Sequence, residues 1–239
     1  IHNIRRPKPD DFQIKQAMEK IKKSKKPIII SGGGVFYSDA MDELGSFAIK
    51  HNIPVTQTVM GYSTMKRDHS HFLGPIGGLG GRAANNLAKE TDLAICVGTK
   101  LADFTTGSWA NFENPEFKLV SINIARHDAN KHLAEAVIGD AKVCLSELSN
   151  SLGNWKSPDS WHKKSQDELK SWNEYVDKES GPTNQKTPNY AHAVGAIYRN
   201  SDPTDIAVTA AGGLVGEVVQ VWRPKELNTR MKLNGVLVA

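Results

Sequence analysis

Three consecutive glycines, Gly32, Gly33 and Gly34, are the residues of this sequence whose type and position could bind a phosphate group. They follow the apolar run 28–30 and precede Ser38 and Asp39, which are typical of a helix start. Glycine lets an anion approach the backbone closely, and bare N–H groups at a helix N-terminus attract negative charge. The chemistry in question is therefore the binding of a dinucleotide pyrophosphate.

The residues around these glycines depart from a dinucleotide fingerprint. Tyr37 stands where the fingerprint has Gly or Ala, and residues 55–59 contain no Asp or Glu that could hold a ribose hydroxyl. The sequence has no Gly-Lys-Ser/Thr, which excludes a P-loop. We expect the turn to connect a strand tightly to its helix, and binding of FAD or NAD at Gly32–Gly34 remains the alternative.

Two further segments could suggest a metal site. In residues 69–71 two histidines flank a serine, but a zinc site needs a third or fourth ligand that the sequence does not supply at usable spacing. In residues 139–141 Gly-Asp-Ala lacks the second glycine of the Gly-Asp-Gly segment that holds Mg²⁺ on a diphosphate. Asp140 is instead predicted to cap a helix. We therefore predict no metal site in this chain.

Composition places the chain among ordinary globular proteins. Of 239 residues, 39% are hydrophobic and 23% are charged, and no apolar run approaches the roughly 18 residues of a membrane span. Cys96 and Cys144 lie in apolar runs without Cys-x-x-Cys spacing, which indicates buried thiols in a reducing cytosol. The first residues include neither an initiator Met nor an apolar signal region. We expect a cytoplasmic piece of a longer polypeptide with no membrane contact.

The positive charge is concentrated near the start of the chain. Residues 1–26 hold nine Lys or Arg against three Asp or Glu, within a net charge of +4. The lysines of residues 20–26 crowd the end of a predicted helix, where cations favour the negative end of the helix dipole. No aromatic residue interleaves with them, as a nucleic-acid platform would require. We therefore predict no nucleic-acid partner.

Short apolar strands alternate with amphipathic helices from residue 10 to about residue 152. Such alternation predicts βαβ units and a doubly wound parallel sheet, Rossmann-like, with helices on both faces. We therefore predict an α/β domain over residues 1–152, with an irregular segment between the second strand and the helix near Gly81. The expected strands are 28–30, 54–58, 93–98, 118–124 and 136–138, and the expected helices begin near Asp11, Ser38, Gly81 and Asp140.

The composition of the sequence changes after Gly153. Residues 153–188 are polar and are predicted to form a helical and linker segment, whose helix carries Trp161, Leu169 and Val176 at helical spacing and lies on another surface. A new unit over residues 189–239 has a helix after Tyr190 and a strand over 206–209. About 50 residues cannot bury a core of their own. We expect the start of a truncated second α/β domain.

Several runs of the sequence resemble a known family. Residues 74–77, 83–88 and 97–109 are similar to the central domain of thiamine-diphosphate enzymes of the acetohydroxyacid synthase and pyruvate oxidase superfamily. Residues 103–109, 122–124, 128–132 and 139–142 resemble, more narrowly, the trihydroxycyclohexane-1,2-dione hydrolases of inositol catabolism. The resemblance extends to about residue 222, because residues 187–190 and 210–222 are similar to the opening of the diphosphate-binding domain.

This resemblance implies an enzyme that uses thiamine diphosphate and Mg²⁺ to cleave a C–C bond and open a cyclic diketone ring, working as a homo-oligomer, a dimer or tetramer. Ala211, Gly212 and Gly213 match a loop close to the cofactor, where backbone N–H groups could serve phosphate oxygens. The family's activating glutamate and Mg²⁺-holding segment have no counterpart in this chain. We therefore expect no catalytic residue in it, and an isolated chain that is inactive.

The same resemblance leaves Gly32, Gly33 and Gly34 as a vestige of a nucleotide-binding turn, because some superfamily members hold FAD in this domain. Two other functions stay open. One is a module that binds FAD or NAD at this turn, and the other is a structural domain that pairs with like chains. The exact substrate also stays open among cyclic diones, other diketones and 2-oxo acids.

Overall fold

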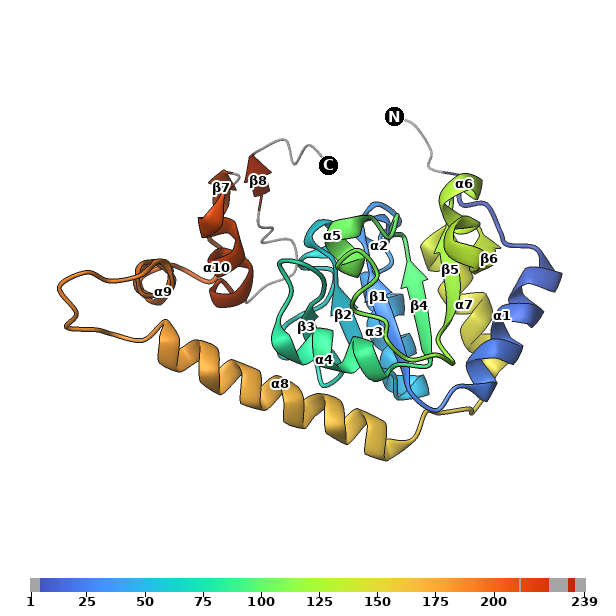
Figure 1. The fold of residues 1–239 in the computed structure, drawn as a ribbon. Coiled ribbons are helices and arrows are strands. Elements are labelled where there is room, and N and C mark those ends of the chain that lie inside the picture. Colours follow the sequence, from blue (N-terminus) through green and yellow to red (C-terminus); the bar gives the residue numbers. More distant parts are fainter. Residues whose placement is uncertain (1–4, 211, 224–231, 235–239) are drawn as a thin grey trace.

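In a computed structural model of the chain, which describes residues 5–210, 212–223 and 232–234, six parallel strands form the central sheet (Figure 1). The strand order is β3-β2-β1-β4-β5-β6. The predicted α/β fold with a doubly wound parallel sheet is confirmed. The strands are β1 Pro27–Ser31, β2 Val55–Gln57, β3 Phe72–Pro75, β4 Leu93–Val97, β5 Lys118–Asn123 and β6 Glu135–Ile138.

The middle of the sheet is apolar because it is covered on both faces. All residues of β1 and β4 are buried, and Ile29 of β1 pairs with Val55 of β2 on one side and with Ile95 of β4 on the other. A strand covered on both faces reads as a continuous apolar run rather than an alternating one. This pattern is the reason that the strands in the middle of the sheet could be predicted from the sequence.

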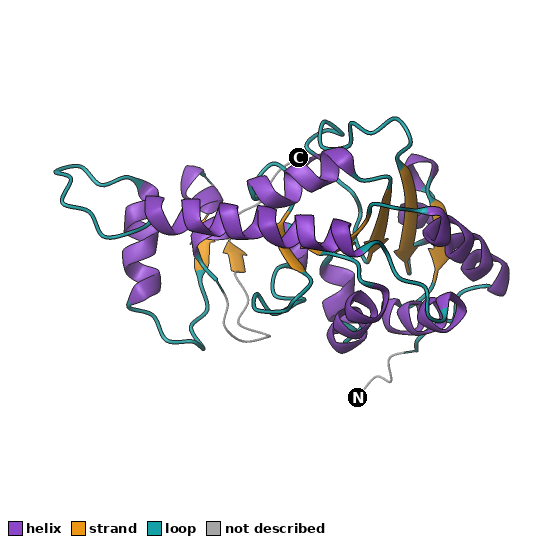
Figure 2. Cartoon of the chain, turned by 90° about the horizontal axis from the view of Figure 1, so that it is seen from below, coloured by secondary structure: helices purple, strands orange, loops and turns teal. Residues whose placement is uncertain are grey.

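Helices cover the two faces of the sheet (Figures 1 and 2). Helices α1 Asp11–Lys23, α3 Met41–His51 and α7 Ala141–Leu152 share one face, where α7 contacts both of the others. Helices α4 Arg82–Glu90 and α8 Asp159–Glu179 contact each other on the opposite face. Right-handed crossovers that run in opposite directions from the middle of the sheet place α3, between β1 and β2, and α4, between β3 and β4, on opposite faces. The short helical turns are α2 Gly33–Tyr37, η1 Val59–Gly61, α5 Asp103–Thr106, α6 Arg126–Ala129 and η2 Lys131–Leu133.

The glycine turn differs from the expectation. The predicted helix start at Ser38 is wrong, because the glycines themselves begin helix α2 and the following helix α3 starts at Met41. Ser38 instead ends α2, and its N–H donates to the carbonyl of Gly34 at 2.9 Å. Asp39 then takes a left-handed conformation with φ of 50°, which turns the chain into α3.

Strand β3 falls within the segment that was expected to be irregular. Its residues 72–75 end in Gly74 and Pro75, which are poor strand formers, so the local sequence hides it. The strand lies at the edge of the sheet, where proline is tolerated, and its register with β2 shifts between Val55 and Thr56. Pairing with β2, rather than local propensity, produces this strand.

Helix α8 joins two apolar cores. Trp161 and Leu169 lie in the main core with the sheet, whereas Val176 lies in a second, smaller core. The second core is built by α9 Tyr190–Arg199 and α10 Gly213–Val221, and it also contains Tyr62 from the first part of the chain. In the same region β7 Val208–Ala210 pairs in parallel with β8 Lys232–Asn234. The long helix therefore packs on the sheet at one end and on α10 at the other.

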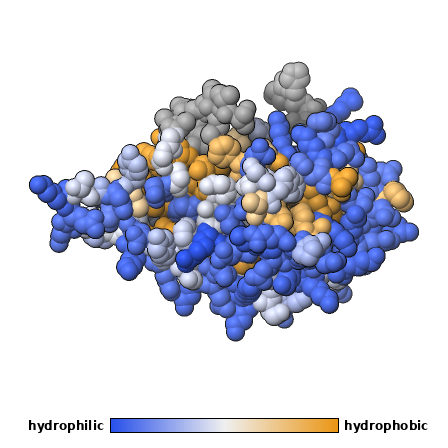
Figure 3. Space-filling model, in the orientation of Figure 1, coloured by the Kyte–Doolittle hydropathy of each residue, from blue (hydrophilic) through white to orange (hydrophobic). Residues whose placement is uncertain are grey.

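The surface and the cysteines agree with the composition. Figure 3 shows a face on which hydrophilic residues predominate, with smaller apolar areas between them. Cys96 and Cys144 are both buried and free, as predicted, and burial raises the pKa of the Cys144 thiol to about 12. Within the described residues, no helix combines the length and apolarity that crossing a membrane would require.

Candidate functional site

The glycine turn lies where a sheet of this topology offers a ligand crevice. Strands β1 and β4 are neighbours, and the chain leaves them toward opposite edges of the sheet. Ligands of doubly wound sheets bind beyond the carboxyl ends of the strands at such a switch point. Gly32–Gly34 follows β1 directly, and Gly98 follows β4 directly. Both turns therefore lie at the carboxyl ends of neighbouring strands, at the switch point of the sheet.

The two turns at this switch point are in direct backbone contact. The N–H of Gly32 donates to the carbonyl of Val97 at 2.8 Å, and the N–H of Gly34 donates to the carbonyl of Gly98 at 2.9 Å. A Cβ atom on Gly34 would lie 2.6 Å from the Cα of Gly98. The glycines are thus required for packing of backbone against backbone, and two of their N–H groups are already bonded within the protein.

A small pocket lies beside this contact, with a volume of about 220 Å³. That volume is below the range of roughly 300–1,000 Å³ that is usual for small-molecule sites. Two of its polar side chains have partners within the protein: Asn123 donates to the carbonyl of Thr99 at 3.1 Å, and Asp128 pairs with Lys131 at 2.7 Å. The hydrogen bond from Lys131 lowers the pKa of the Asp128 carboxyl. This geometry gives little support to a dinucleotide site.

A second candidate lies at the N-terminal end of α10. Gly212 precedes the helix with φ of 130°, which favours glycine, and a Cβ atom there would have no neighbour within 4 Å. Gly212, Gly213 and Leu214 are exposed, and no side chain caps the helix. The first N–H groups of a helix have no partner within the helix and attract phosphate. Gly212 and Gly213 therefore form an exposed, uncapped helix start with room for a phosphate group beside it; Ala211 lies outside the described residues.

The side chains considered as metal ligands have other partners. Asp140 caps α7 as predicted, accepting from the N–H of Lys142 at 3.1 Å, and it also pairs with Arg6 at 3.1 Å. The ring of His71 stacks on that of His162 at 4.1 Å and hydrogen bonds to Asn52 at 3.2 Å. No group of three His, Cys, Asp or Glu side chains that could hold a metal ion occurs in the described part of the chain. These residues do not fit Mg²⁺.

Burial decides the charge state of the histidines near α8. The pKa of His71 is lowered to about 4, first by desolvation and then by the charges of His162 and His69. Desolvation also lowers the pKa of His162 and of His69. All three rings are therefore neutral at pH 7 and act in packing and hydrogen bonding.

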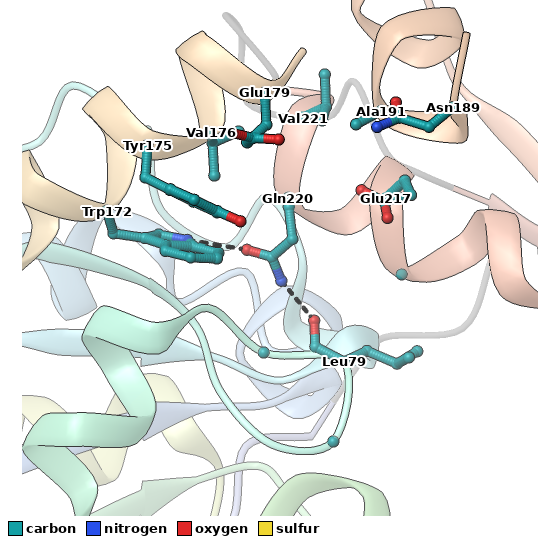
Figure 4. Close-up of a pocket in the computed structure, with 13 residues that line it drawn as sticks. Leu79, Trp172, Tyr175, Val176, Glu179, Asn189, Ala191, Glu217, Gln220 and Val221 are labelled. Atoms are coloured by element: carbon teal, nitrogen blue, oxygen red, sulfur yellow. Dashed lines mark hydrogen bonds between the residues drawn. The ribbon is translucent and has the colours of Figure 1, made fainter. Parts of the chain in front are cut away.

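A larger cavity of about 410 Å³ is lined by residues of α8, α9 and α10 and by the loop at residues 78–80 (Figure 4). Gln220 of α10 spans one side of it. Its Nε2 donates to the carbonyl of Leu79 at 2.6 Å, and its Oε1 accepts from Nε1 of Trp172 at 3.1 Å. Trp172 stacks on Tyr175, and the guanidinium of Arg82 lies over both rings. No motif in the sequence pointed to Gln220 or Trp172, because their importance depends on contacts between distant segments.

Comparison with known proteins identifies the family. Residues 14–148 match the family model described as the thiamine pyrophosphate enzyme, central domain. The chain belongs to this family. The matched residues run from α1 to α7, so they include every strand of the six-stranded sheet. The resemblance to the central domain of thiamine-diphosphate enzymes, inferred from residues 74–109, is confirmed.

The curated relatives agree with the narrower resemblance. The chain is 36% identical to 3D-(3,5/4)-trihydroxycyclohexane-1,2-dione hydrolase of Clostridium perfringens (strain 13 / Type A), over 93% of the chain and 38% of the relative. Identity is 35% to the protein of that name in Clostridium botulinum (strain Alaska E43 / Type E3), and 34% to that of Bacillus anthracis, each over 96% of the chain. The chain spans 39% of the length of each of these two relatives.

Proposed function

We propose that this chain serves as the central domain, with the adjoining start of the diphosphate-binding domain, of a thiamine-diphosphate-dependent hydrolase that opens the ring of trihydroxycyclohexane-1,2-dione in inositol catabolism. One observation carries the proposal: the match to hydrolases of that name extends over 93–96% of the chain and so beyond the central domain to α10. A shared fold alone would not specify the reaction.

The chain's own residues have limited parts in this chemistry. When bound, thiamine diphosphate supplies the carbon nucleophile and the electron sink for cleavage of the C–C bond. Gly212 and Gly213 would donate backbone hydrogen bonds to its phosphate oxygens, since they lie at the exposed and uncapped start of α10. The central sheet would support the parts of the enzyme that surround the substrate. Gly32–Gly34 would connect β1 to α2 without holding a nucleotide.

We propose further that the 239-residue chain has no turnover by itself, because its described residues offer no set of ligands for Mg²⁺. A cytoplasmic location, a homo-oligomeric parent enzyme and the absence of a nucleic-acid partner belong to the same proposal. The charge distribution supports the last point, since the basic residues of α1 gather at its C-terminal end, where they favour the helix dipole.

A chimera tests the proposal. Residues 5–222 would replace the matching segment of the Clostridium perfringens relative, and ring opening of the cyclic dione would be measured with and without thiamine diphosphate. We expect cofactor-dependent activity in the chimera. A folded chimera that binds thiamine diphosphate but does not open the ring would contradict the assigned reaction. Turnover by the 239-residue chain itself would contradict its proposed inactivity.

Binding of FAD or NAD is the second candidate, because a pocket exists at the switch point of the sheet. A rise of the melting temperature with FAD or NAD would favour it, whereas we expect no shift. The remaining alternative, a structural domain that pairs with like chains, has the exposed side chains of Ile124 and Leu133 in its favour. Light scattering distinguishes it, because a strict monomer at high concentration argues against self-assembly.

A further inference from the structure

The two ends of helix α10 have different surroundings. Its N-terminal end, at Gly213, is exposed and has no side-chain cap. Its C-terminal end is surrounded by other parts of the protein, and Val218, Val219 and Val221 are buried. The last four carbonyl groups of a helix have no partner within the helix, so a buried C-terminal end needs donors from elsewhere.

Tyr62 supplies such a donor from the first part of the chain. Its hydroxyl donates to the carbonyl of Trp222, which follows α10, and to that of Val219 at 3.4 Å. The side chain is buried, with 7% of its surface exposed, and it lies in the same apolar core as α10. Burial raises the pKa of the Tyr62 hydroxyl to about 12, so the group keeps its proton in neutral solution.

Gln220, in the same helical turn, forms a second connection (Figure 4). Its amide donates to the carbonyl of Leu79, in the loop before α4, and accepts from the indole of Trp172 on α8. One side chain of α10 therefore contacts both the central domain and the long helix. A hydrogen bond to a fixed backbone carbonyl constrains direction as well as distance.

These contacts hold α10 at its C-terminal end, whereas Gly212 and Gly213 at its N-terminal end are exposed. A nine-residue helix is about 13.5 Å long at 1.5 Å per residue, and it behaves as a rigid element. A change of tilt at its C-terminal end therefore displaces Gly212 and Gly213 at its N-terminal end. Any ligand held by the N–H groups of that turn would lose hydrogen bonds, because these bonds weaken steeply as their geometry departs from the optimum.

We propose that Tyr62 and Gln220 are positioning residues, which fasten the C-terminal end of α10 to the central domain and thereby place the Gly212–Gly213 turn for the diphosphate of the cofactor. The identity of the ligand rests on the proposed function, whereas the fastening of the helix does not. The central domain thus takes part in cofactor binding without touching the cofactor.

Spin-label distance measurements on the full 239-residue chain test the fastening without any ligand. Labels would be attached at Lys118→Cys on the sheet and Leu214→Cys on α10; both native cysteines are buried and would remain unlabelled. We expect a narrow distance distribution in the parent protein and a broader one in the Tyr62→Phe and Gln220→Ala variants. Loss of stability alone would not broaden the distances within the folded population.

Tyr198→Phe is the matched control, because the Tyr198 hydroxyl donates to the carbonyl of Arg223, one residue beyond the carbonyl of Trp222 that Tyr62 serves. Tyr198 extends from α9, so its loss should leave the connection between α10 and the central domain in place. We expect its distance distribution to match that of the parent protein. Distributions that stay unchanged in both Tyr62→Phe and Gln220→Ala would overturn the positioning role.

A second measurement separates this inference from the proposed function. Inorganic pyrophosphate with Mg²⁺ would be titrated calorimetrically into the unlabelled parent protein and the variants. We expect binding roughly tenfold weaker in Tyr62→Phe and Gln220→Ala, the loss of about one hydrogen bond, and unchanged binding in Tyr198→Phe. Absence of binding in the parent protein would overturn the cofactor role of Gly212 and Gly213. Equal affinity in all four proteins would overturn the link between the fastening and the ligand.

Discussion

The amide nitrogen of Gly34 donates a hydrogen bond to the carbonyl oxygen of Gly98 at 2.9 Å. This hydrogen bond joins the turn that follows β1 to the turn that follows β4. Gly98 has φ of 61°, and a Cβ atom on it would lie 2.5 Å from the Cα of Gly34. Glycine at both positions is thus explained by the close approach of two strand-to-helix turns. A nucleotide is not needed to account for it.

Gly98→Ala should therefore be strongly destabilising. The added methyl would overlap the backbone of Gly34, and the left-handed conformation would add strain, so we expect a loss of about 3 kcal/mol or more in the free energy of unfolding. Gly153→Ala is the matched control, because Gly153 has φ of 62° but nothing within 4 Å of a Cβ atom. Strain alone should lower its stability by about 1–2 kcal/mol. Urea unfolding measures both, and equal losses would refute the crowding argument.

Stability should fall as the pH is lowered from 6.5 toward 4. The pKa of His71 is lowered to about 4 in the folded chain, so between these pH values the unfolded state binds more protons and gains stability relative to the folded state. His162, stacked on His71, also has a lowered pKa and adds to the effect. The stabilisation is complete above pH 6.5 and is lost as the pH falls through the folded pKa values. We expect a decrease on the order of 1–3 kcal/mol.

The measurement is the midpoint of urea unfolding at several pH values. His71→Asn removes the titrating ring and should flatten the profile, even if it lowers stability at pH 7. His127→Gln is the control, because His127 is exposed on α6, and its profile should follow that of the parent protein. A profile that stays equally steep in His71→Asn would assign the acid sensitivity to other groups.

Trp161→Phe tests whether α8 is an integral part of the central domain. The indole of Trp161 donates to the carbonyl of Pro27 at 2.9 Å, and only 4% of the side chain is exposed. Phenylalanine keeps most of the apolar contact but leaves a buried carbonyl of β1 unpaired, which costs about 1–3 kcal/mol. Trp155→Phe, at a half-buried position, should cost less. Equal and small losses in the free energy of unfolding would indicate that the hydrogen bond from Trp161 to Pro27 contributes little to the packing of α8 on the sheet.

Asp140→Ala should cost more than the same change at another helix cap. Asp140 caps α7 and also pairs with Arg6, and its side chain is 4% exposed. Asp10 caps α1 in an exposed position, where it accepts from the N–H of Phe12 at 2.8 Å. We expect losses of about 2–4 kcal/mol for Asp140→Ala and about 1 kcal/mol for Asp10→Ala. Thermal unfolding at pH 7 compares the two, and similar values would mean that the ion pair adds nothing.

Elements of this fold that depend on local apolar patterns can be predicted from the sequence, whereas elements that depend on distant contacts cannot. Strands such as 93–97 were predicted because burial on both faces leaves a continuous apolar run in the local sequence. Strand β3 was missed because Gly74 and Pro75 form a strand only through pairing with β2. The start of α3 was placed too early, at Ser38, because the pattern of apolar residues does not reveal the left-handed backbone conformation of Asp39.

Some residues of the candidate site could likewise be selected from the sequence, and others could not. Gly212 and Gly213 could be selected from the sequence, because a loop of small residues after a strand is conspicuous and the family resemblance covers it. Tyr62 and Gln220 could not be selected, since their partners lie 160 and 141 residues away and are backbone carbonyls, which carry no sequence signal. The roles of Trp172 and Leu79 in the same connection were hidden for the same reason.

The sequence by itself determined the family, the parallel sheet and the place of the glycine turn, because these depend on local patterns of apolar residues and on long runs shared with relatives. Only the tertiary structure shows which partners the N–H groups of Gly32 and Gly34 have. Two N–H groups that could have served a pyrophosphate are bonded to Val97 and Gly98, from a strand more than 60 residues away. Hydrogen-bond donors are available to a ligand only when the fold leaves them unpaired, and that depends on contacts that no local pattern records.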